Sequence, residues 1–554
     1  MNINMISKNI KYGNVGLIAP QLLVIFILVF FTRCNGGTND QKPAVAQVPV
    51  ADTIPTIASG SFNQASGIVF DSTAINQFLK SKPLFKEFSN DYFTFYRANN
   101  FNYVWYDNKG LIESSSALIS SLAEVEHEGV TTNFPYKDSI DNIFHSYSDT
   151  TNKFKPDINT ELLLTGEYFY YAEKIYAGSL NSKTESINWY LPRKKLSYAA
   201  LLDNNLKNGA LEKQFGQVVS LQYECLKKEL RHYKDIDNRG GEVVVASLKK
   251  PNTLKPKDSS GVIGSVRKRL FQLGDISEDD GSIIYDSKLA DAVNQAKERY
   301  GLKTNSVIDN ALIREINVPA KIRVEQIIVN MERLRWLPIN TTSSEFILVN
   351  IPEYALVYYE NGKAAWRCGV VVGKPMTKTV IFSGNLQYVV FSPYWYVPTS
   401  IINKEVKPGM KRDKNYLASH RMEWNGGRVR QKPGPSNSLG LVKFLFPNSN
   451  NIYLHDTPSK SLFGEDARAF SHGCVRVSQP KELAIRVLRQ YPEWTPGKID
   501  AAMHAGTEKY VTLKKTIPVY IGYFTAFMGT NGKINFRPDI YQRDNRLLEM
   551  LMNH

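Results

Sequence analysis

The residues best suited to covalent chemistry lie in one short run, Ser471-His472-Gly473-Cys474-Val475-Arg476-Val477. A thiol with its ordinary pKa of about 8.5 is only a few per cent thiolate near neutrality, and an adjacent imidazole raises that fraction or takes the proton during attack. If the run is extended, His472 shares a face with Cys474 and Arg476, because residues two apart point the same way. His455, with fifteen residues between it and the run, can reach the same place across a loop. The run therefore predicts an acylating Cys-His pair.

The backbone and the charge of this run favour the same chemistry. Gly473 has no side chain, so its peptide and that of Cys474 can approach a substrate carbonyl and donate N–H groups to a developing oxyanion. Ser471 is expected to support this loop. Arg476 adds a fixed positive charge, which either holds a substrate carboxylate or supports the loop.

Two other kinds of site use similar residues. A zinc centre would need further ligands, but no second cysteine or carboxylate stands at metal-ligand spacing beside Cys474 and the histidines. A serine hydrolase would carry a motif such as G-x-S-x-G, which the sequence lacks. Cysteine chemistry is therefore favoured over a metal site or a serine nucleophile.

The C-terminal third, which must position these residues, has the pattern of β-structure. Strand-forming runs are FILVNI, ALVYYE, RCGVVVG, YVVFS, IYLHD, VRV and PVYIGYFTAF. Asn361-Gly362 and Asn531-Gly532 are placed as two-residue hairpin turns, and one helix, KELAIRVLRQY, follows Pro480. This part of the chain is predicted to be mainly β.

A long insertion interrupts these strands at about 399–441. It is basic and rich in Gly and Pro, and an insertion of this length that is neither periodic nor of low complexity is typically a lid over a site. Its Lys and Arg residues either meet substrate carboxylates or form a solvated basic surface. Just before it, Tyr394 and Trp395 either floor the cleft or pack the sheet.

The preceding half of the chain is predicted to be helical. Leu164, Tyr168 and Tyr171 recur near one face of a helix within 161–180, and core packing explains the many aromatic residues. A Gly-, Lys-, Pro- and Ser-rich stretch at 238–261 marks a domain boundary. Beyond it, apolar residues repeat at helix spacing within 262–319, and a linking helix follows at 323–337.

The first residues indicate export. Lys8 and Lys11 precede an apolar run from Val15 to Phe31, which resembles a secretory signal and is slightly short for a permanent span. Cys34 follows and is a candidate for lipidation, although Arg33 stands where lipoprotein signals have a small residue; an uncleaved anchor or ordinary cleavage are the alternatives.

Composition and cysteine content agree with a large exported globular protein. The chain has 554 residues, of which 43% are apolar and 22% charged, so it is neither a single small module nor disordered. Only four cysteines occur, which is too few for a disulfide-built fold, although a bridge between Cys225 and Cys368 is allowed. The formal charge of +15 favours polyanionic neighbours, and no recognisable module points to nucleic acid.

The run HDT followed by SHGCVRV resembles the catalytic signature of the YkuD family of L,D-transpeptidases. NIPEYALVYYENG, FSPYWYVPTSI and YLHDTPSKSLF are similar to its large, scaffold-bearing branch typified by YcbB, and VRKRLFQLGDI resembles small peptidoglycan-binding domains. The resemblance implies an α+β multidomain protein with a β-sandwich-like catalytic domain. The expected parts are a signal peptide or anchor at 1–34, a linker at 35–70, a helical scaffold at 71–250, a small three-helix peptidoglycan-binding-like domain at 258–319, a connecting helix at 320–343, and a mainly-β YkuD-type catalytic domain at 344–554 with an inserted flap at about 399–441.

The resemblance also assigns roles within the motif. Cys474 matches the nucleophile and His455 the general base and acid, while the backbone carbonyl of Asp456 orients the imidazole. His472 matches the second histidine of the motif, which shapes the acyl pocket. Many relatives carry Asn shortly after the cysteine, whereas this chain has Val475-Arg476, so the roles of that Asn do not transfer.

The activity implied is L,D-transpeptidation of peptidoglycan stem peptides, giving 3→3 cross-links through a cysteine thioester. The enzyme would need no metal or organic cofactor and would work in the cell envelope on the periplasmic side, held to the membrane through its N-terminus. Exchange with a free D-amino acid, trimming of stems by hydrolysis, and a non-catalytic wall anchor that binds through 262–319 are the alternatives. The sequence identifies no protein partner.

Overall fold

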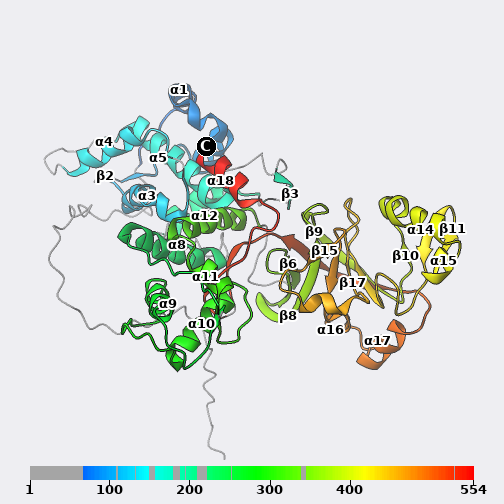
Figure 1. Cartoon of the computed structure of the whole chain (residues 1–554). Coiled ribbons are helices and arrows are strands. Elements are labelled where there is room, and N and C mark those ends of the chain that lie inside the picture. The colour runs from blue at the N-terminus through cyan, green and yellow to red at the C-terminus, as the bar shows by residue number, and fades with distance from the viewer. Residues whose placement is uncertain are drawn as a thin grey trace, which may run out of the picture. The chain divides into compact units, whose positions relative to one another are not determined.

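A computed structural model of the chain describes residues 67–553, apart from 108–109, 132, 149–155, 179–186, 192, 194, 209–220, 251, 338–344 and 530 (Figure 1). The expected signal or anchor at 1–34, Cys34 and most of the linker at 35–70 lie outside the described residues. Across the described part of the chain, every helix is too short or too polar to cross a bilayer.

The region from 73 to 239 is helical, as its periodicity predicts. Its central helix, α5 (Ile158–Ala172), contacts α1, α3 and α6 and is therefore buried on nearly all sides, not on one face as expected. The helices of this region are α1 (Thr73–Ser81), α2 (Ser89–Ala98), α3 (Glu113–Ala123), α4 (Lys137–Ser148), α5, α6 (Tyr198–Asn208) and α8 (Leu221–Arg239), with short turns η1 (Pro83–Phe88), η2 (Val125–Glu128) and η3 (Glu173–Ala177) and short strands β1 (Tyr106–Asp107), β2 (Gly110–Leu111) and β3 (Trp189–Tyr190).

Helix α5 buries two carboxyl groups with different surroundings. Glu161 accepts hydrogen bonds from the Tyr96 hydroxyl at 2.8 Å and from the backbone N–H groups of Val104 and Trp105 at 2.8 and 3.1 Å. Burial nevertheless raises the pKa of Glu161 to about 7. Glu167 is fully buried, and its two carboxyl oxygens find no hydrogen-bond partner among the described residues. Burial raises the pKa of Glu167 to about 9.

Glu167→Met is expected to stabilise the protein at neutral pH. The folded pKa lies above that of the unfolded chain, so the folded state binds more protons and stability falls as pH rises from about 4.5 to about 9. At pH 7 the raised pKa lowers the free energy of unfolding by about 3 kcal/mol. The methionine has no titrating group, so it removes this loss of stability. The free energy of unfolding of both proteins is measured with denaturant at pH 5 and pH 8. Glu126→Met, at an exposed position, is the control. Equal pH dependence in Glu167→Met and the parent chain would contradict the assignment.

The three helices predicted after the domain boundary are present, as α9 (Gly261–Gln272), α10 (Ser287–Arg299) and α11 (Asn310–Ile316). Side-chain oxygens of Ser260, Asp286 and Asp309 cap their first turns. The short strands β4 (Thr253–Leu254) and β5 (Ile308–Asp309) pair beside them. The linking helix follows as α12 (Ala320–Trp336) and is buried along most of its length.

The mainly-β prediction for the C-terminal third is confirmed, with a closed arrangement of strands. The order β13-β14-β16-β8-β7-β6-β17-β9 closes into a ring because β13 also pairs with β9, whereas the resemblance implied a sandwich-like domain. The strands are β6 (Phe346–Asn350), β7 (Ala355–Glu360), β8 (Lys363–Gly373), β9 (Ile381–Phe391), β13 (Val442–Leu445), β14 (Leu454–His455), β15 (Ala469–Ser471), β16 (Val475–Val477) and β17 (Lys509–Gly522), with η6 (Lys460–Gly464), α16 (Pro480–Val487) and α17 (Pro496–Met503) between them.

One hairpin turn is confirmed and the other is longer than predicted. Asn361 and Gly362 both have positive φ between the paired residues Glu360 and Lys363, as a two-residue turn requires. Near Asn531-Gly532, the Gly529 N–H donates to the Lys533 carbonyl at 2.8 Å, which leaves three residues in the turn. This turn joins β18 (Ala526–Met528) and β19 (Ile534–Phe536), and α18 (Asp544–Met552) follows.

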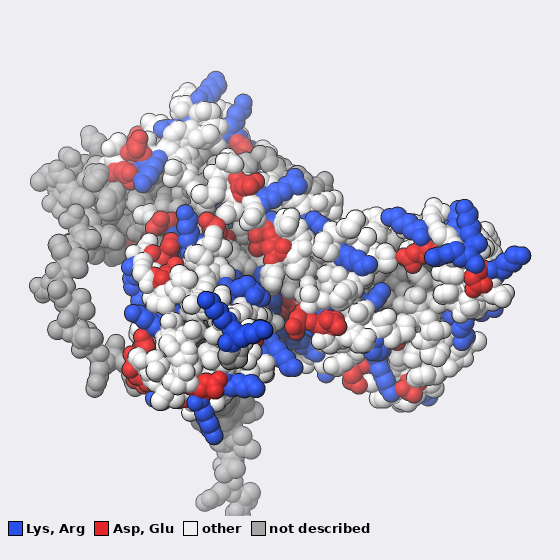
Figure 2. All heavy atoms as spheres, in the orientation of Figure 1, with Lys and Arg blue, Asp and Glu red and all other residues white. Residues whose placement is uncertain are grey.

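The inserted segment folds as a small unit with its own core, which we call the flap. Val397, Val406 and Val429 form this core, separate from the main one. Its elements are β10 (Trp395–Tyr396), α13 (Thr399–Ile401), η5 (Ile402–Val406), α14 (Lys407–Arg412), α15 (Tyr416–Ser419), β11 (Met422–Asn425) and β12 (Arg428–Gln431). Figure 2 shows Lys and Arg side chains gathered on it, among them the exposed Lys411, Arg412, Arg428 and Lys432.

Candidate active site

Two parallel strands bring the predicted histidine beside the predicted nucleophile. Strands β14 and β16 pair with Leu454 opposite Val475 and His455 opposite Arg476. The Val475 N–H also donates to the Tyr453 carbonyl at 3.2 Å, which extends the pairing toward Cys474. Leu454 and Val475 are fully buried, so His455 and Arg476 belong to the other face of the sheet. His455 therefore lies two positions along the ladder from Cys474, on the same face of the sheet, and Cys474 itself is only partly buried.

The nucleophile stands on a tight turn, and the expectation that 471–477 is extended throughout is wrong. Strand β15 ends at Ser471, β16 begins at Val475, and Gly473 between them has φ +121°. A side chain at that φ would be strained, which accounts for the glycine. Because the backbone reverses there, alternation does not place His472 beside Cys474. His472 is half exposed, and its Nε2 lies 3.6 Å from Glu405 Oε1 of the flap.

Hydrogen bonds hold this turn from inside. The Gly473 N–H donates to Ser471 Oγ at 3.1 Å, and the Ser471 hydroxyl donates to the Cys474 carbonyl at 2.5 Å. Ser471 thus takes the supporting place predicted for it. The Gly473 N–H is occupied, so the expectation that it binds an oxyanion is not met, whereas the Cys474 N–H has no partner among the described residues.

The imidazole of His455 is oriented by its own neighbour. Its Nδ1 lies 2.5 Å from the Asp456 carbonyl oxygen, which can only accept, so Nδ1 carries the proton and Nε2 has the free lone pair. The Asp456 carboxylate accepts from the Leu441 N–H at 2.9 Å and the Thr457 N–H at 2.7 Å, and also pairs with Lys460. These contacts fix the peptide whose carbonyl holds the imidazole.

The electrostatics of the site keep both partners neutral. Burial, aided by the positive charge of Arg476, lowers the pKa of His455 to about 4. Burial raises the pKa of the Cys474 thiol, while hydrogen bonds from Tyr453 and the charge of Arg476 oppose that rise. At neutral pH the pair is therefore a thiol beside a neutral imidazole, and attack requires the imidazole to take the thiol proton as the sulfur reacts.

Arg476 is a partly buried cation beside these two groups. Burial lowers its pKa, and its Nε finds no hydrogen-bond partner in the part of the chain that the structure describes. No ion pair holds its guanidinium among the same residues. Of the two predicted roles, the absence of contacts within the loop favours binding of an incoming carboxylate over support.

Tyr453 is a site residue that the sequence reasoning missed. Its ring packs edge-on to that of His455 with centroids 5.8 Å apart, and Tyr453 lowers the pKa of the Cys474 thiol against the effect of burial. The thiol itself donates to the Asn451 carbonyl, with Sγ 3.7 Å from that oxygen. Tyr453 stands two residues before His455 on an extended segment, so strand alternation would have placed it on the same face.

Tyr394 and Trp395 lie at the start of the flap and contact its residues. Trp395 pairs with Gln431 across β10 and β12 and packs against the flap core. The Arg430 guanidinium lies 4.0 Å from the centre of the Tyr394 ring.

Other predicted features give no second site. Within the described residues, no group of three or more His, Cys, Asp or Glu side chains is placed to hold a metal ion. Cys225 lies buried in α8 and Cys368 buried in β8, and no disulfide joins them.

Fold and site together are those of a YkuD-type catalytic domain. Residues 344–521 match the L,D-transpeptidase catalytic domain YkuD, and residues 91–230 match the family described as Scaffold domain. The segment 344–521 is therefore assigned to the L,D-transpeptidase catalytic domain family.

One curated protein and two solved structures are similar to parts of the chain. A curated protein of Haemophilus influenzae named "Putative L,D-transpeptidase" is 34% identical over 244 residues, which are 40% of this chain and 49% of that protein. The match thus spans about half the length of the relative. Among solved structures, an L,D-transpeptidase from Xylanimonas cellulosilytica is 12% identical, covering 50% of this chain and 100% of its own with a TM-score of 0.18. One from Mycobacterium smegmatis is also 12% identical, covering 32% and 59%, with a TM-score of 0.19. The assignment rests on the family matches rather than on these two alignments.

Proposed function

We propose that this chain forms 3→3 cross-links in peptidoglycan. The donor is a tetrapeptide stem, which Cys474 attacks at the carbonyl between the third residue, a diamino acid, and the terminal D-amino acid. The observation that supports this most is the His455 imidazole, clamped through Nδ1 at 2.5 Å and left with a free Nε2 on the strand beside Cys474.

The reaction follows from these groups. His455 Nε2 takes the thiol proton as sulfur bonds to the carbonyl carbon, and the Cys474 N–H donates to the developing oxyanion. The C–N bond then breaks, and His455 returns the proton to the departing amine, so that a D-amino acid leaves and a thioester remains. The side-chain amine of a second stem loses a proton to His455, attacks the thioester and restores the free thiol. This chemistry needs no metal or organic cofactor.

Substrate binding is assigned to the charges around the thiol. Arg476 takes the terminal carboxylate of the donor stem, because it is a partly buried cation without a carboxylate partner among the described residues. The exposed Lys and Arg residues of the flap face the acidic groups of neighbouring stems. Closure of the flap would exclude water and so favour the amine acceptor over hydrolysis.

Purified protein incubated with tetrapeptide muropeptides tests this function. We expect D-alanine release together with dimers of the mass of a 3→3 cross-link. Tripeptide monomers alone would identify a trimming enzyme, and incorporation of added D-amino acids an exchange enzyme. If no muropeptide changes, the remaining interpretation is that the protein is a non-catalytic wall anchor. Fractionation of cells, with and without residues 1–34, tests the proposed attachment to the membrane on the periplasmic side.

The acid limb of the pH profile is expected to lie near pH 4 to 5. His455 acts as a base only when neutral, and its low pKa keeps it neutral down to about pH 4. An ordinary histidine, of pKa about 6.5, would lose roughly thirtyfold in activity by pH 5. The pH dependence of kcat/KM for D-alanine release measures this. Arg476→Met removes the neighbouring charge and should move the acid limb upward, whereas a parent profile that falls near pH 6.5 would contradict the assignment.

A further inference from the structure

The segment after the matched catalytic domain reaches the back of the nucleophile turn. Tyr541, which is almost fully buried, donates from its hydroxyl to the Gly373 carbonyl at 2.6 Å, at the end of strand β8. The same hydroxyl oxygen accepts from the Thr379 N–H at 3.2 Å. Tyr541 therefore ties together both ends of the loop that follows β8.

That loop in turn holds the peptide that carries the nucleophile. The fully buried Thr379 hydroxyl donates to the Gly473 carbonyl at 2.9 Å and accepts from the Gly373 N–H at 2.9 Å. Two further groups of the same loop, the Thr377 hydroxyl and the Lys374 N–H, both donate to the Ser471 carbonyl at 3.0 Å. The loop thus holds the turn by its backbone, at the Ser471 carbonyl and at the peptide that joins Gly473 to Cys474.

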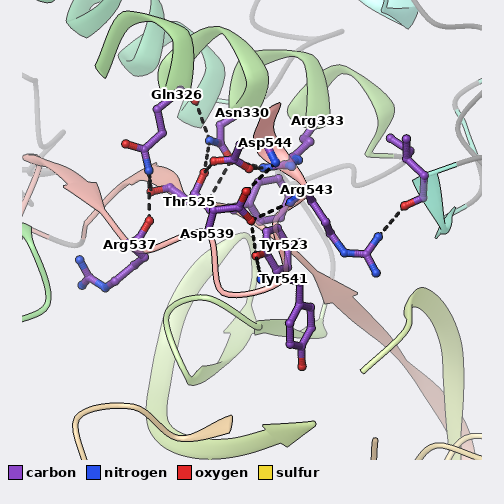
Figure 3. A network of polar contacts seen from close by, with 12 residues as sticks. Gln326, Asn330, Arg333, Tyr523, Thr525, Arg537, Asp539, Tyr541, Arg543 and Asp544 are labelled. Carbon is purple, nitrogen blue, oxygen red and sulfur yellow. Dashed lines mark hydrogen bonds and ion pairs between the residues drawn. The ribbon is translucent and has the colours of Figure 1, made fainter. Parts of the chain in front are cut away.

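Tyr541 itself is fixed by a buried polar network that ends on helix α12 (Figure 3). Its N–H donates to the Tyr523 hydroxyl at 2.8 Å, and that hydroxyl donates to Asp539 at 2.5 Å. Asp539 also accepts from the Asp544 N–H at 2.7 Å. The two tyrosine rings stack with their centroids 5.6 Å apart.

Helix α12 closes the network from the other side. Asp544 pairs with Arg333 of α12 at 2.7 Å and accepts from the Thr525 hydroxyl at 2.6 Å. Asn330 of α12 exchanges two hydrogen bonds with Thr525, and both residues are fully buried. An unbroken path of hydrogen bonds therefore runs from α12 through Tyr541 to the nucleophile turn.

We infer that Tyr541 and Thr379 are positioning residues for Cys474, and that the C-terminal segment 523–552 exists in part to hold them. The inference deepens the proposed function, because it concerns the same thiol. Neither residue touches the reacting atoms. Their effect is to fix the Gly473-Cys474 peptide, so that the Cys474 N–H points at the oxyanion and Sγ stays beside Tyr453 and His455.

Tyr541→Phe tests this, since it removes only the hydroxyl and keeps the stacked ring. We expect kcat for D-alanine release to fall about tenfold while KM changes less than twofold, because the substrate-binding groups are untouched. Thr379→Val should lower kcat by a similar factor, because it also removes the hydroxyl. Thr379→Ser keeps the hydroxyl and should have the rate of the parent chain. The double variant Tyr541→Phe/Thr379→Val should be no worse than Thr379→Val, because both act through one path. Tyr520→Phe on strand β17 is the control.

A second readout separates this inference from the proposed function. We would measure labelling of Cys474 by iodoacetamide at pH 7, located by peptide mapping. A loosened turn moves Sγ from the Tyr453 hydrogen bonds that favour thiolate, so labelling should slow about threefold in Tyr541→Phe and Thr379→Val, and not in Thr379→Ser or Tyr520→Phe.

If the parent chain leaves tetrapeptides unchanged but this labelling pattern holds, the proposed function fails and the positioning role stands. If Tyr541→Phe is folded by circular dichroism and labels at the parent rate, the inference is overturned. A loss of melting temperature with unchanged labelling would mean a merely structural role and would overturn it equally.

Discussion

Cys474→Ala is expected to lower the rate of D-alanine release by roughly 10⁴-fold or more, because it removes the atom that carries the acyl group. The other two cysteines that the structure describes, Cys225 and Cys368, are buried in α8 and β8. The measurement is single-turnover release of D-alanine from a tetrapeptide donor, with folding checked by circular dichroism.

The matched control is Cys368→Ala, which removes a second buried thiol from the same domain without touching the motif. It should keep activity within about twofold. If Cys474→Ala retained more than a few per cent of parent activity, the thioester route would have to be abandoned.

His455→Gln is expected to reduce the same rate by about 10³-fold, within the range typical of a lost general base. The substitution keeps a side chain of similar length but supplies no group that can take the thiol proton. His472→Gln, in contrast, should cost less than about tenfold, because His472 is half exposed and its Nε2 lies 3.6 Å from the flap carboxylate of Glu405.

The comparison of the two histidines discriminates between two assignments of the base. Alternation in an extended motif would favour His472, whereas the strand register and the Nδ1 clamp favour His455. Rates of D-alanine release for the two variants, measured side by side at pH 7, decide between them. A larger loss in His472→Gln than in His455→Gln would show that His472 takes the proton.

The candidate pair His455 and Cys474 could be proposed from the sequence because its signals are local. The strand-forming residues around His455 and Cys474 are clear in the sequence, and the motif identified both side chains before any contact was known. The alternation of side chains along a strand could not predict on which side of the turn the His472 side chain lies. A single glycine at φ +121° reverses the backbone there, and alternation says nothing about where it breaks.

The supporting residues lay beyond sequence reasoning because they act across long separations. Thr379 reaches Gly473 across 94 residues and Tyr541 reaches Gly373 across 168, and neither stands in a run of unusual composition. The same is true of β3, where Trp189 of the helical region pairs with Ile381 of the catalytic sheet. Contacts of this kind depend on the closed fold rather than on local propensity.

Intact-mass and peptide-mapping analysis of the enzyme, acid-quenched during turnover of a tetrapeptide donor without acceptor, tests the central claim most directly. The account predicts an adduct on the peptide containing Cys474 that adds the mass of the donor minus the mass of D-alanine and that disappears when an amine acceptor is added. Cross-linked product formed with no such adduct, or an adduct on any other residue, would contradict it.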